Sequence, residues 1–483
     1  METTRLLGVC SSLWAKMYFL LAVLLVTATT SSIITFPTSF TSFEDEKINP
    51  SDVKNRYQKG IEAAQSVAGL VQNILLQETV DFAAQNWVIS PVSLAGVFAQ
   101  LLMGSRGEIR EILTDALSLV YDEKNLTKLE VHRQLGDLLK YLHHPSKNDY
   151  TLLLNSAVFL QTGFPLKATY KHALMDFYDT PILPVDFAGN SSKSINKMNQ
   201  WVRNSTLNRF SDLMTLPLSP NTVSIMASIV YFKGAWELPF DPDYTQPGLF
   251  FIDDKRKVQV DFMYGEQQVF HGNSSDFQLI GIPYKSHQIV IYILLPNKKF
   301  SSRVAMNQFD QLATSAKLEN VTLVLPKIKL STTISVKDAI SKYLRRSRQN
   351  YSRQSKFGRN VKYSNEVDSF SNSNLPIPII ASSMSTFRKA KRNDFDLGGA
   401  SDDVRFKIDD IIHKVSMQID EFGTELVAAT STLVDHSGDD FVLRINRPFL
   451  FFVRHEITLT HLFCGFVTNP TQSSTVQKPT RKF

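Results

Sequence analysis

Three residue types that can perform nucleophilic catalysis stand next to each other at Asp435, His436 and Ser437. In a working triad these side chains come from distant segments, and three consecutive residues of an extended segment cannot converge. The sequence also has no Gly-X-Ser-X-Gly elbow, His-Glu-X-X-His pair or glycine-rich phosphate loop. The adjacent His143 and His144 do not make a metal site by themselves. We therefore expect a protein that is not an enzyme, with no catalytic residues, metal or cofactor.

The segment around these three residues has the composition of a loop that can become a strand. From Glu421 to Leu443 it has no Lys or Arg, and from Thr424 to Val434 it has strand propensity. The plain alternative is an exposed loop that joins two strands. Since a simple loop does not need strand propensity, the pattern favours a stored conformational switch.

The elements around this segment change from helical to extended along the chain. Apolar residues at helical spacing cover Ser51–Gln77 and Leu94–Leu119, and the second stretch is broken near Gly104–Gly107. Apolar runs predict buried strands at Leu152–Leu160, Val223–Phe232, Leu279–Tyr284, Ile289–Leu295, Val321–Leu330, Ile411–Ile419, Phe441–Val453 and Leu462–Val467. Helices early and strands late predict an α+β fold.

The first 28 residues are predicted to be a signal peptide. Arg5 and Lys16 precede the apolar run Met17–Val26, and Val26–Ala28 offers small residues for cleavage. The run is too short to cross a bilayer, although a short membrane anchor is the alternative, and no other segment reaches the length of a transmembrane helix. We expect a secreted, extracellular protein with no membrane span and a flexible N-terminal tail at residues 29–51.

If the protein is secreted, its cysteines and its glycosylation sequons can be interpreted. Cleavage would remove Cys10 and leave Cys464, within an apolar run, as a buried and unreactive thiol. A framework of disulfides is then impossible. Six Asn-X-Ser/Thr sequons predict a glycoprotein, namely Asn125, Asn190, Asn204, Asn273, Asn320 and Asn350.

The composition is that of a folded protein with one exceptional segment. Hydrophobic residues make up 43% and charged residues 20% of the chain, which excludes wholesale disorder and a polytopic membrane protein. The formal net charge is +6, and residues 345–392 alone hold eleven basic and two acidic residues. These residues follow no helical or strand period. We expect an irregular basic insertion on a slightly acidic body.

A set of motifs occurs along the chain in the order of one known family. The motifs are Asn86–Ser93, Asn199–Val202 with Thr206, Asp212–Met214, Tyr231–Glu237, Pro239–Pro242, Leu325–Ile328, His413–Lys414, Glu421–Thr424, Asn446–Phe449 and Phe463–Pro470. With them the chain resembles the serpin family over roughly residues 52–471, apart from the insertion. One such motif can arise by chance, but this many in order hardly can.

The resemblance implies an architecture and an activity. It implies a serpin domain at residues 52–475, of about nine helices and three β-sheets, with an exposed reactive-centre loop at 421–445. It also implies a monomer that offers this loop as bait to an extracellular serine protease. After cleavage and formation of the acyl-enzyme, the loop would insert into the main sheet as a new strand and trap the protease.

The resemblance also assigns roles by position. The proximal hinge would comprise Glu421, Gly423, Thr424, Leu426, Ala428, Ala429 and Thr430. The shutter, a buried polar cluster beneath the opening strands, would comprise Ser90, Ser93, Asn199 and His413. The breach, where insertion starts, would comprise Tyr231, Lys233 and Trp236. Ordinary buried packing is the alternative for the shutter and for Trp236.

The scissile bond can be counted in two ways. With the family's spacing, counting forward from Glu421 and back from Asn446 gives the same bond, Ser437–Gly438. A small residue before the cleaved bond suits an elastase-like pocket, whereas trypsin-like proteases need Lys or Arg there. We expect an elastase- or chymotrypsin-like target. Alternative cleavage points are His436, Leu433 and Phe441.

Some residues depart from the family pattern. Leu426 and Val427 stand where inhibitory members usually carry Ala, and Leu426 would face the sheet interior after insertion. Overpacking typically costs ~1–3 kcal/mol and could slow insertion. A non-inhibitory serpin, acting as a carrier, scaffold or precursor, is therefore the alternative. Ser156 and Ser228 stand where Asn is usual in the internal strands.

Basic residues at both ends of the insertion are candidates for binding a polyanion such as a glycosaminoglycan. They are Arg345, Arg346, Arg348, Arg388, Lys389, Lys391 and Arg392. The alternative is a solvated or protease-sensitive loop. Nucleic acid is not an expected partner, because the run lacks the interleaved aromatic residues of such sites.

Overall fold

The structure, a computed structural model, describes residues 49–77, 85–119, 126–143, 150–215, 218–297, 302–338, 397–424, 441–472 and 474–476. The predicted signal peptide, the basic insertion and residues 425–440 of the reactive-centre loop lie outside the described residues. From Ser51 onward the chain forms one compact unit.

Helices cover the first third of the described chain, and the periodicity of apolar residues predicts those up to residue 119. They are α2 (Pro50–Gln77), α3 (Pro91–Gly104), α4 (Gly107–Ala116), α5 (Leu126–Leu142), α6 (Ala168–Tyr178) and α7 (Ser191–Ser205), with the short 3-10 helix η1 (Pro242–Tyr244) and α8 (Ser302–Ser315) later in the chain. The start of α3 is fixed because the Ser90 side chain accepts a hydrogen bond from the Ser93 amide and Pro91 occupies the first turn. The predicted break after α3 is confirmed.

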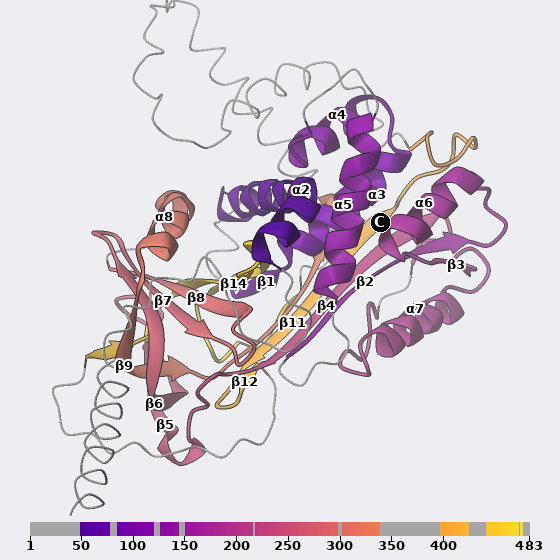
Figure 1. The fold of residues 1–483 in the computed structure, drawn as a ribbon. Coiled ribbons are helices and arrows are strands. Elements are labelled where there is room, and N and C mark those ends of the chain that lie inside the picture. The colour runs from indigo at the N-terminus through magenta and orange to yellow at the C-terminus, as the bar shows by residue number, and fades with distance from the viewer. Residues whose placement is uncertain are drawn as a thin grey trace, which may run out of the picture. The chain divides into compact units, whose positions relative to one another are not determined.

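A seven-stranded sheet, the main sheet, carries the strands that position the candidate site. Its order is β16 (Ser474–Val476), β10 (Ile328–Ser335), β11 (Asp410–Ile419), β4 (Ser224–Ala235), β2 (Tyr150–Gln161) and β3 (Ile182–Val185), with the two-residue strand β12 (Gly423–Thr424) paired to β4. The central neighbours β4 and β11 are parallel. Figure 1 shows the long strands side by side, with α3 and α5 on one side of them and α7 on the other.

The second sheet has nine strands and is continuous through β6. Its strands are β1 (Trp87–Ile89), β15 (Thr460–Val467), β14 (Phe449–His455), β8 (Ile289–Pro296), β7 (Phe277–Pro283), β6 (Lys257–Asn273), β9 (Lys317–Pro326), β13 (Val442–Arg444) and β5 (Gln246–Phe251). β6 pairs with β9 along Phe262–His271 and with β7 along Phe270–Asn273. Because β6 pairs with strands on both sides, the described residues form two sheets, whereas the resemblance to serpins implies three. The α+β class is confirmed.

Two predicted strands are each divided in the structure. The run Val321–Leu330 becomes β9 and β10, which belong to different sheets, and the run Phe441–Val453 becomes β13 and β14. A proline, which cannot donate to a ladder, stands near each division, at Pro326 and Pro448. A continuous apolar run does not reveal where the chain crosses between sheets.

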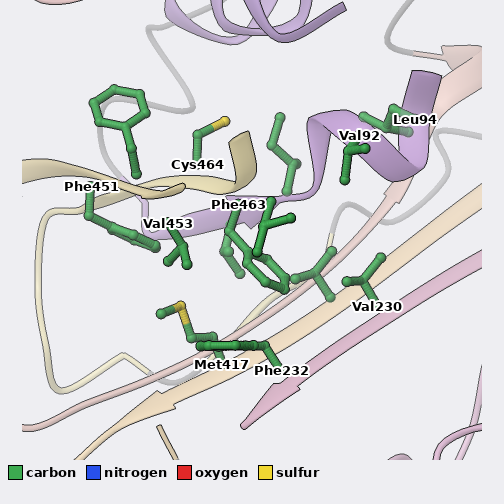
Figure 2. Close-up of a cluster of buried hydrophobic side chains, with 14 of the residues drawn as sticks. Val92, Leu94, Val230, Phe232, Met417, Phe451, Val453, Phe463 and Cys464 are labelled. Atoms are coloured by element: carbon green, nitrogen blue, oxygen red, sulfur yellow. The ribbon is translucent and has the colours of Figure 1, made fainter. Parts of the chain in front are cut away.

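The two sheets pack on each other through a shared apolar core. Figure 2 shows Phe232 of β4 and Met417 of β11 facing Phe463 of the second sheet, and the rings of Phe232 and Phe463 lie 5.7 Å apart. Cys464 is buried, as predicted. None of the helices in the described ranges is long and apolar enough to cross a membrane.

Candidate functional site

The strands β4 and β11 cease to pair at the end of the main sheet where the reactive-centre loop begins. Their parallel pairing ends with Tyr231 opposite Ser416. The chain then reverses in a turn in which the amides of Asp420 and Gly423 each donate to the other's carbonyl, at 2.8 and 3.2 Å. After the turn, β12 runs antiparallel to β4, with Thr424 opposite Gly234. The start of the predicted hinge is therefore already a short strand beside β4.

The turn requires a glycine at position 423. The φ of Gly423 is 133°, which other residues rarely adopt, and a Cβ at this position would lie 2.0 Å from the carbonyl oxygen of Gly234. The hinge residues Glu421, Gly423 and Thr424 are thus placed by the structure. The remaining hinge and cleavage-site residues lie outside the described residues, namely Leu426, Val427, Ala428, Ala429, Thr430, Ser437 and Gly438.

Glu421 is tied to two neighbouring segments. Its Oε1 accepts hydrogen bonds from Lys327 Nζ at 2.9 Å and from Thr245 Oγ1 at 2.8 Å. Burial raises the pKa of the Glu421 carboxyl, but the hydrogen bonds from Lys327 and Thr245 outweigh burial and the net shift of the pKa is downward. The carboxylate is therefore charged at neutral pH and fixes the turn before the hinge.

Trp236 is the predicted breach residue that binds the hinge. Its Nε1 donates to the Asp420 carbonyl at 2.9 Å, and its backbone amide donates to the Phe422 carbonyl at 3.1 Å. Tyr231 and Lys233 alternate onto the other face of β4, where Tyr231 packs in the core beneath α7. The structure therefore brings one of the three predicted breach residues to the hinge, because strand alternation separates it from the other two.

Tyr284 completes the hinge contacts, and the sequence analysis missed it. Its ring stacks on Trp236 with the centroids 4.7 Å apart, and its hydroxyl makes a 2.7 Å hydrogen bond with Thr424 Oγ1. Burial raises the pKa of Tyr284 well above its ordinary value, so the hydroxyl keeps its proton. The sequence marked Tyr284 only as the end of an apolar run, whereas Lys327 lay inside a family motif.

Three of the four predicted shutter residues meet under the paired strands. The Ser90 amide donates to His413 Nε2 at 3.1 Å, and His413 Nδ1 lies 3.0 Å from Ser228 Oγ. Ser228 Oγ in turn lies 2.7 Å from Ser93 Oγ. Ser228, which stands where Asn is usual in the family, is therefore the fourth member of the cluster.

His413 is neutral in this cluster and its tautomer is defined. Because Nε2 accepts the Ser90 N–H, Nδ1 carries the proton and donates it to Ser228. Burial lowers the pKa of His413 to about 3. Neutral hydrogen bonds thus join the start of α3 to β4 and β11.

Asn199 is not part of the shutter cluster. It lies on α7, whose side chains pack on the opposite face of β4 from α3. Its Oδ1 accepts from the Leu213 amide at 2.7 Å, and its Nδ2 donates to the Met214 carbonyl at 3.0 Å. Asn199 therefore holds the segment after α7 against this helix. A sequence motif identifies the helix but not the face that the helix presents to the sheet.

Four of the six sequons are described, and all four asparagines are exposed, namely Asn190, Asn204, Asn273 and Asn320. Asn190 also caps α7 by accepting from the Lys193 amide at 2.8 Å. Asn125, Asn350 and the seven candidate basic residues of the insertion lie outside the described residues. In the part of the chain that the structure describes, no three His, Cys, Asp or Glu side chains are grouped so as to hold a metal ion.

The fold defines a class, an α+β protein in which the central strands β4 and β11 of the main sheet cease to pair beside the short strand β12. Comparison with known proteins identifies the family. The family model for serpins, described as serine protease inhibitors, matches residues 68–347 and 385–470. The chain therefore belongs to the serpin family. The gap between the two matched ranges falls within residues 345–392.

Individual relatives are distant in sequence and close in fold. Iripin-3 of Ixodes ricinus is 26% identical over 396 residues, which cover 80% of this chain and 89% of that protein. Human thyroxine-binding globulin in complex with thyroxine has a TM-score of 0.65 at 21% identity, covering 86% of this chain and 100% of the other. Mouse protein-Z dependent protease inhibitor has a TM-score of 0.66 at 20% identity, with 88% and 100% covered. Protease inhibitors and hormone-binding proteins thus both occur among the relatives.

Proposed function

We propose that this serpin inhibits a serine protease as a suicide substrate that is cleaved at Ser437–Gly438. The observation that carries the proposal is β12, which already runs antiparallel to β4 at the point where β4 and β11 cease to pair. A cleaved loop would not have to find a strand partner, because it would only extend a pairing that exists.

The register of β12 indicates where the inserting strand would lie. Continued along β4, it puts Leu426 opposite Phe232 and Val434 opposite Ser224, the first residue of β4. The segment with strand propensity, residues 424–434, therefore matches the length of β4 from Gly234 down. The proposed scissile bond follows shortly after the end of that strand.

The protease supplies the chemistry of the proposed reaction. Its catalytic serine oxygen attacks the carbonyl carbon of Ser437 and forms an ester, while the peptide bond to Gly438 breaks and the Gly438 amine leaves with a proton. Water would then hydrolyse the ester. Inhibition requires that the loop inserts before this hydrolysis, so the outcome is a race between two rates.

A panel of proteases tests the proposal. Ser437 is small and no Lys or Arg lies between Glu421 and Leu443, so we expect SDS-resistant complexes with elastase- or chymotrypsin-like proteases and none with trypsin-like ones. Mass spectrometry of the released peptide should show an N-terminus at Gly438. Cleavage of the loop by every active protease without any stable complex would contradict inhibition.

A non-inhibitory serpin is the second candidate, and one contact favours it. Leu426 would enter beside Phe232, whose ring is buried and lies 5.2 Å from the ring of Tyr284. Overpacking at this position would cost about 1–3 kcal/mol and would favour cleavage without insertion. If this candidate is right, wild-type protein forms no complex and Leu426→Ala gains one.

We further propose that the protein is secreted, that it is glycosylated, and that residues 345–392 bind a glycosaminoglycan. Exposure of the four described sequons supports glycosylation, and the excess of basic over acidic residues supports polyanion binding. Retention on heparin that is unchanged by deletion of residues 345–392 would rule out the insertion as the binding segment.

A further inference from the structure

Thr424 and Tyr284 depend on each other for their hydrogen bonding. Both residues are fully buried, each with 0% of its surface exposed, and their hydroxyls lie 2.7 Å apart. A buried hydroxyl left without a partner costs more than the hydrogen bond contributes when it is made. The position of Thr424 beside β4 is therefore coupled to the presence of the Tyr284 hydroxyl.

Tyr284 is the fixed member of this pair. Its ring stacks on Trp236 and meets Phe232 edge-on, at 89° and 5.2 Å. Its amide donates to the Ile289 carbonyl at 3.0 Å. The ring also covers Gly234, where an added Cβ would lie 2.7 Å from the Tyr284 ring. Residues of β4 and β8 together with Trp236 thus hold Tyr284 in place, and Thr424 is the residue that can leave.

We propose that Tyr284 is a positioning residue for loop insertion, because it holds Thr424 paired with Gly234 before the loop is cleaved. The pairing of Gly423 and Thr424 with β4 is then the nucleus from which the loop extends. A nucleus matters because the first contact between two strands bears the entropic cost of closing the chain, and each later pair adds to a strand already in register. The insertion step rests on the proposed function, whereas the pairing in the uncleaved protein does not.

Hydrogen exchange of the uncleaved protein tests the pairing without any protease. Tyr284→Phe removes one oxygen and keeps the ring. We expect amides in residues 420–424 and 233–236 to exchange about tenfold faster, as expected for the loss of one buried hydrogen bond, while the rest of β4 stays protected.

Two further variants distinguish the loss of the Tyr284–Thr424 hydrogen bond from a general loss of stability. The double variant Tyr284→Phe with Thr424→Val removes both hydroxyls at nearly constant shape, so it should restore protection. Tyr244→Phe makes the same chemical change at a tyrosine that is 47% exposed and should leave exchange unchanged. Unchanged exchange in Tyr284→Phe, a loss of protection along all of β4, or no recovery in the double variant would overturn the proposal.

A second measurement tests the consequence for insertion. With a protease that the wild-type protein traps, Tyr284→Phe should raise several-fold the fraction of loops cleaved without a complex, and the double variant should lower that fraction again. An unchanged fraction despite faster exchange would overturn the role in insertion. If no protease is trapped by the wild-type protein, the proposed function fails, and the exchange experiment still decides whether Tyr284 holds Thr424.

Discussion

Burial fixes the protonation state of single residues in the candidate site. The His413 ring is fully buried, its pKa is lowered to about 3, and it takes part in the shutter as a neutral donor and acceptor. Glu421 is also buried, but Lys327 and Thr245 keep it charged. Burial alone therefore keeps His413 neutral, whereas the hydrogen bonds to Glu421 outweigh burial and keep its carboxylate charged.

The pH dependence of stability follows from His413. Between the ordinary pKa of 6.5 and the folded value of about 3, the unfolded chain binds a proton that the folded chain does not. The free energy of unfolding therefore falls as the pH drops below 6.5, by up to about 1.4 kcal/mol per pH unit for each such group. His413→Asn should remove one group's share of this slope in urea unfolding between pH 7 and 5. Parallel pH profiles of the two proteins would contradict the assignment.

Family motifs predict site residues that lie within the motifs themselves. They do not predict residues whose role depends on a contact between distant segments or on the face that a helix presents. His413, Ser90 and Ser93 were found from family motifs, and the structure brings them together. Tyr284 could not be found, because its contact with Thr424 joins positions 140 apart in sequence. Asn199 was misplaced because a helix motif does not specify which side of the sheet the helix covers.

At the scale of elements, β12 depends on one backbone conformation. Gly423 turns the chain back onto β4 with a φ of 133°, and there is no room for a Cβ against the Gly234 carbonyl. The direction of β12 thus depends on a single glycine. Apolar runs predicted β2, β4 and β11 of the main sheet, but not the pairing of β12 with β4, because no apolar run marks that contact.

Gly423→Ala should therefore weaken the hinge more than an ordinary glycine substitution does. We expect the free energy of unfolding to fall by more than about 2 kcal/mol, since backbone strain of about 1–3 kcal/mol adds to a clash. Gly163→Ala is the matched control, because its φ is 80° but a Cβ there would meet nothing within 4 Å. Urea unfolding of both variants measures the difference. Equal losses in the two variants would show that the space at position 423 is unimportant.

In the whole molecule, the two faces of the main sheet pack against different elements. The even-numbered residues of β4 pack toward α3 and the second sheet, and the odd-numbered ones pack toward α7. Opening the sheet between β4 and β11 must break the hydrogen bond between Ser228 and His413. The α+β class could be predicted from the sequence, but the joining of two expected sheets through β6 could not, because strand register is decided by long-range pairing.

We propose above all that cleavage of the reactive-centre loop lets this loop become a strand of the main sheet. Thermal unfolding of the intact protein and of protein cleaved at Ser437–Gly438 tests it most directly. Insertion of residues 424–434 would add roughly ten backbone hydrogen bonds at about 1 kcal/mol each. For a domain of this size, at about 1 °C per kcal/mol, the melting temperature should rise by about 10 °C on cleavage. A melting temperature that is unchanged or lower after cleavage would contradict the account.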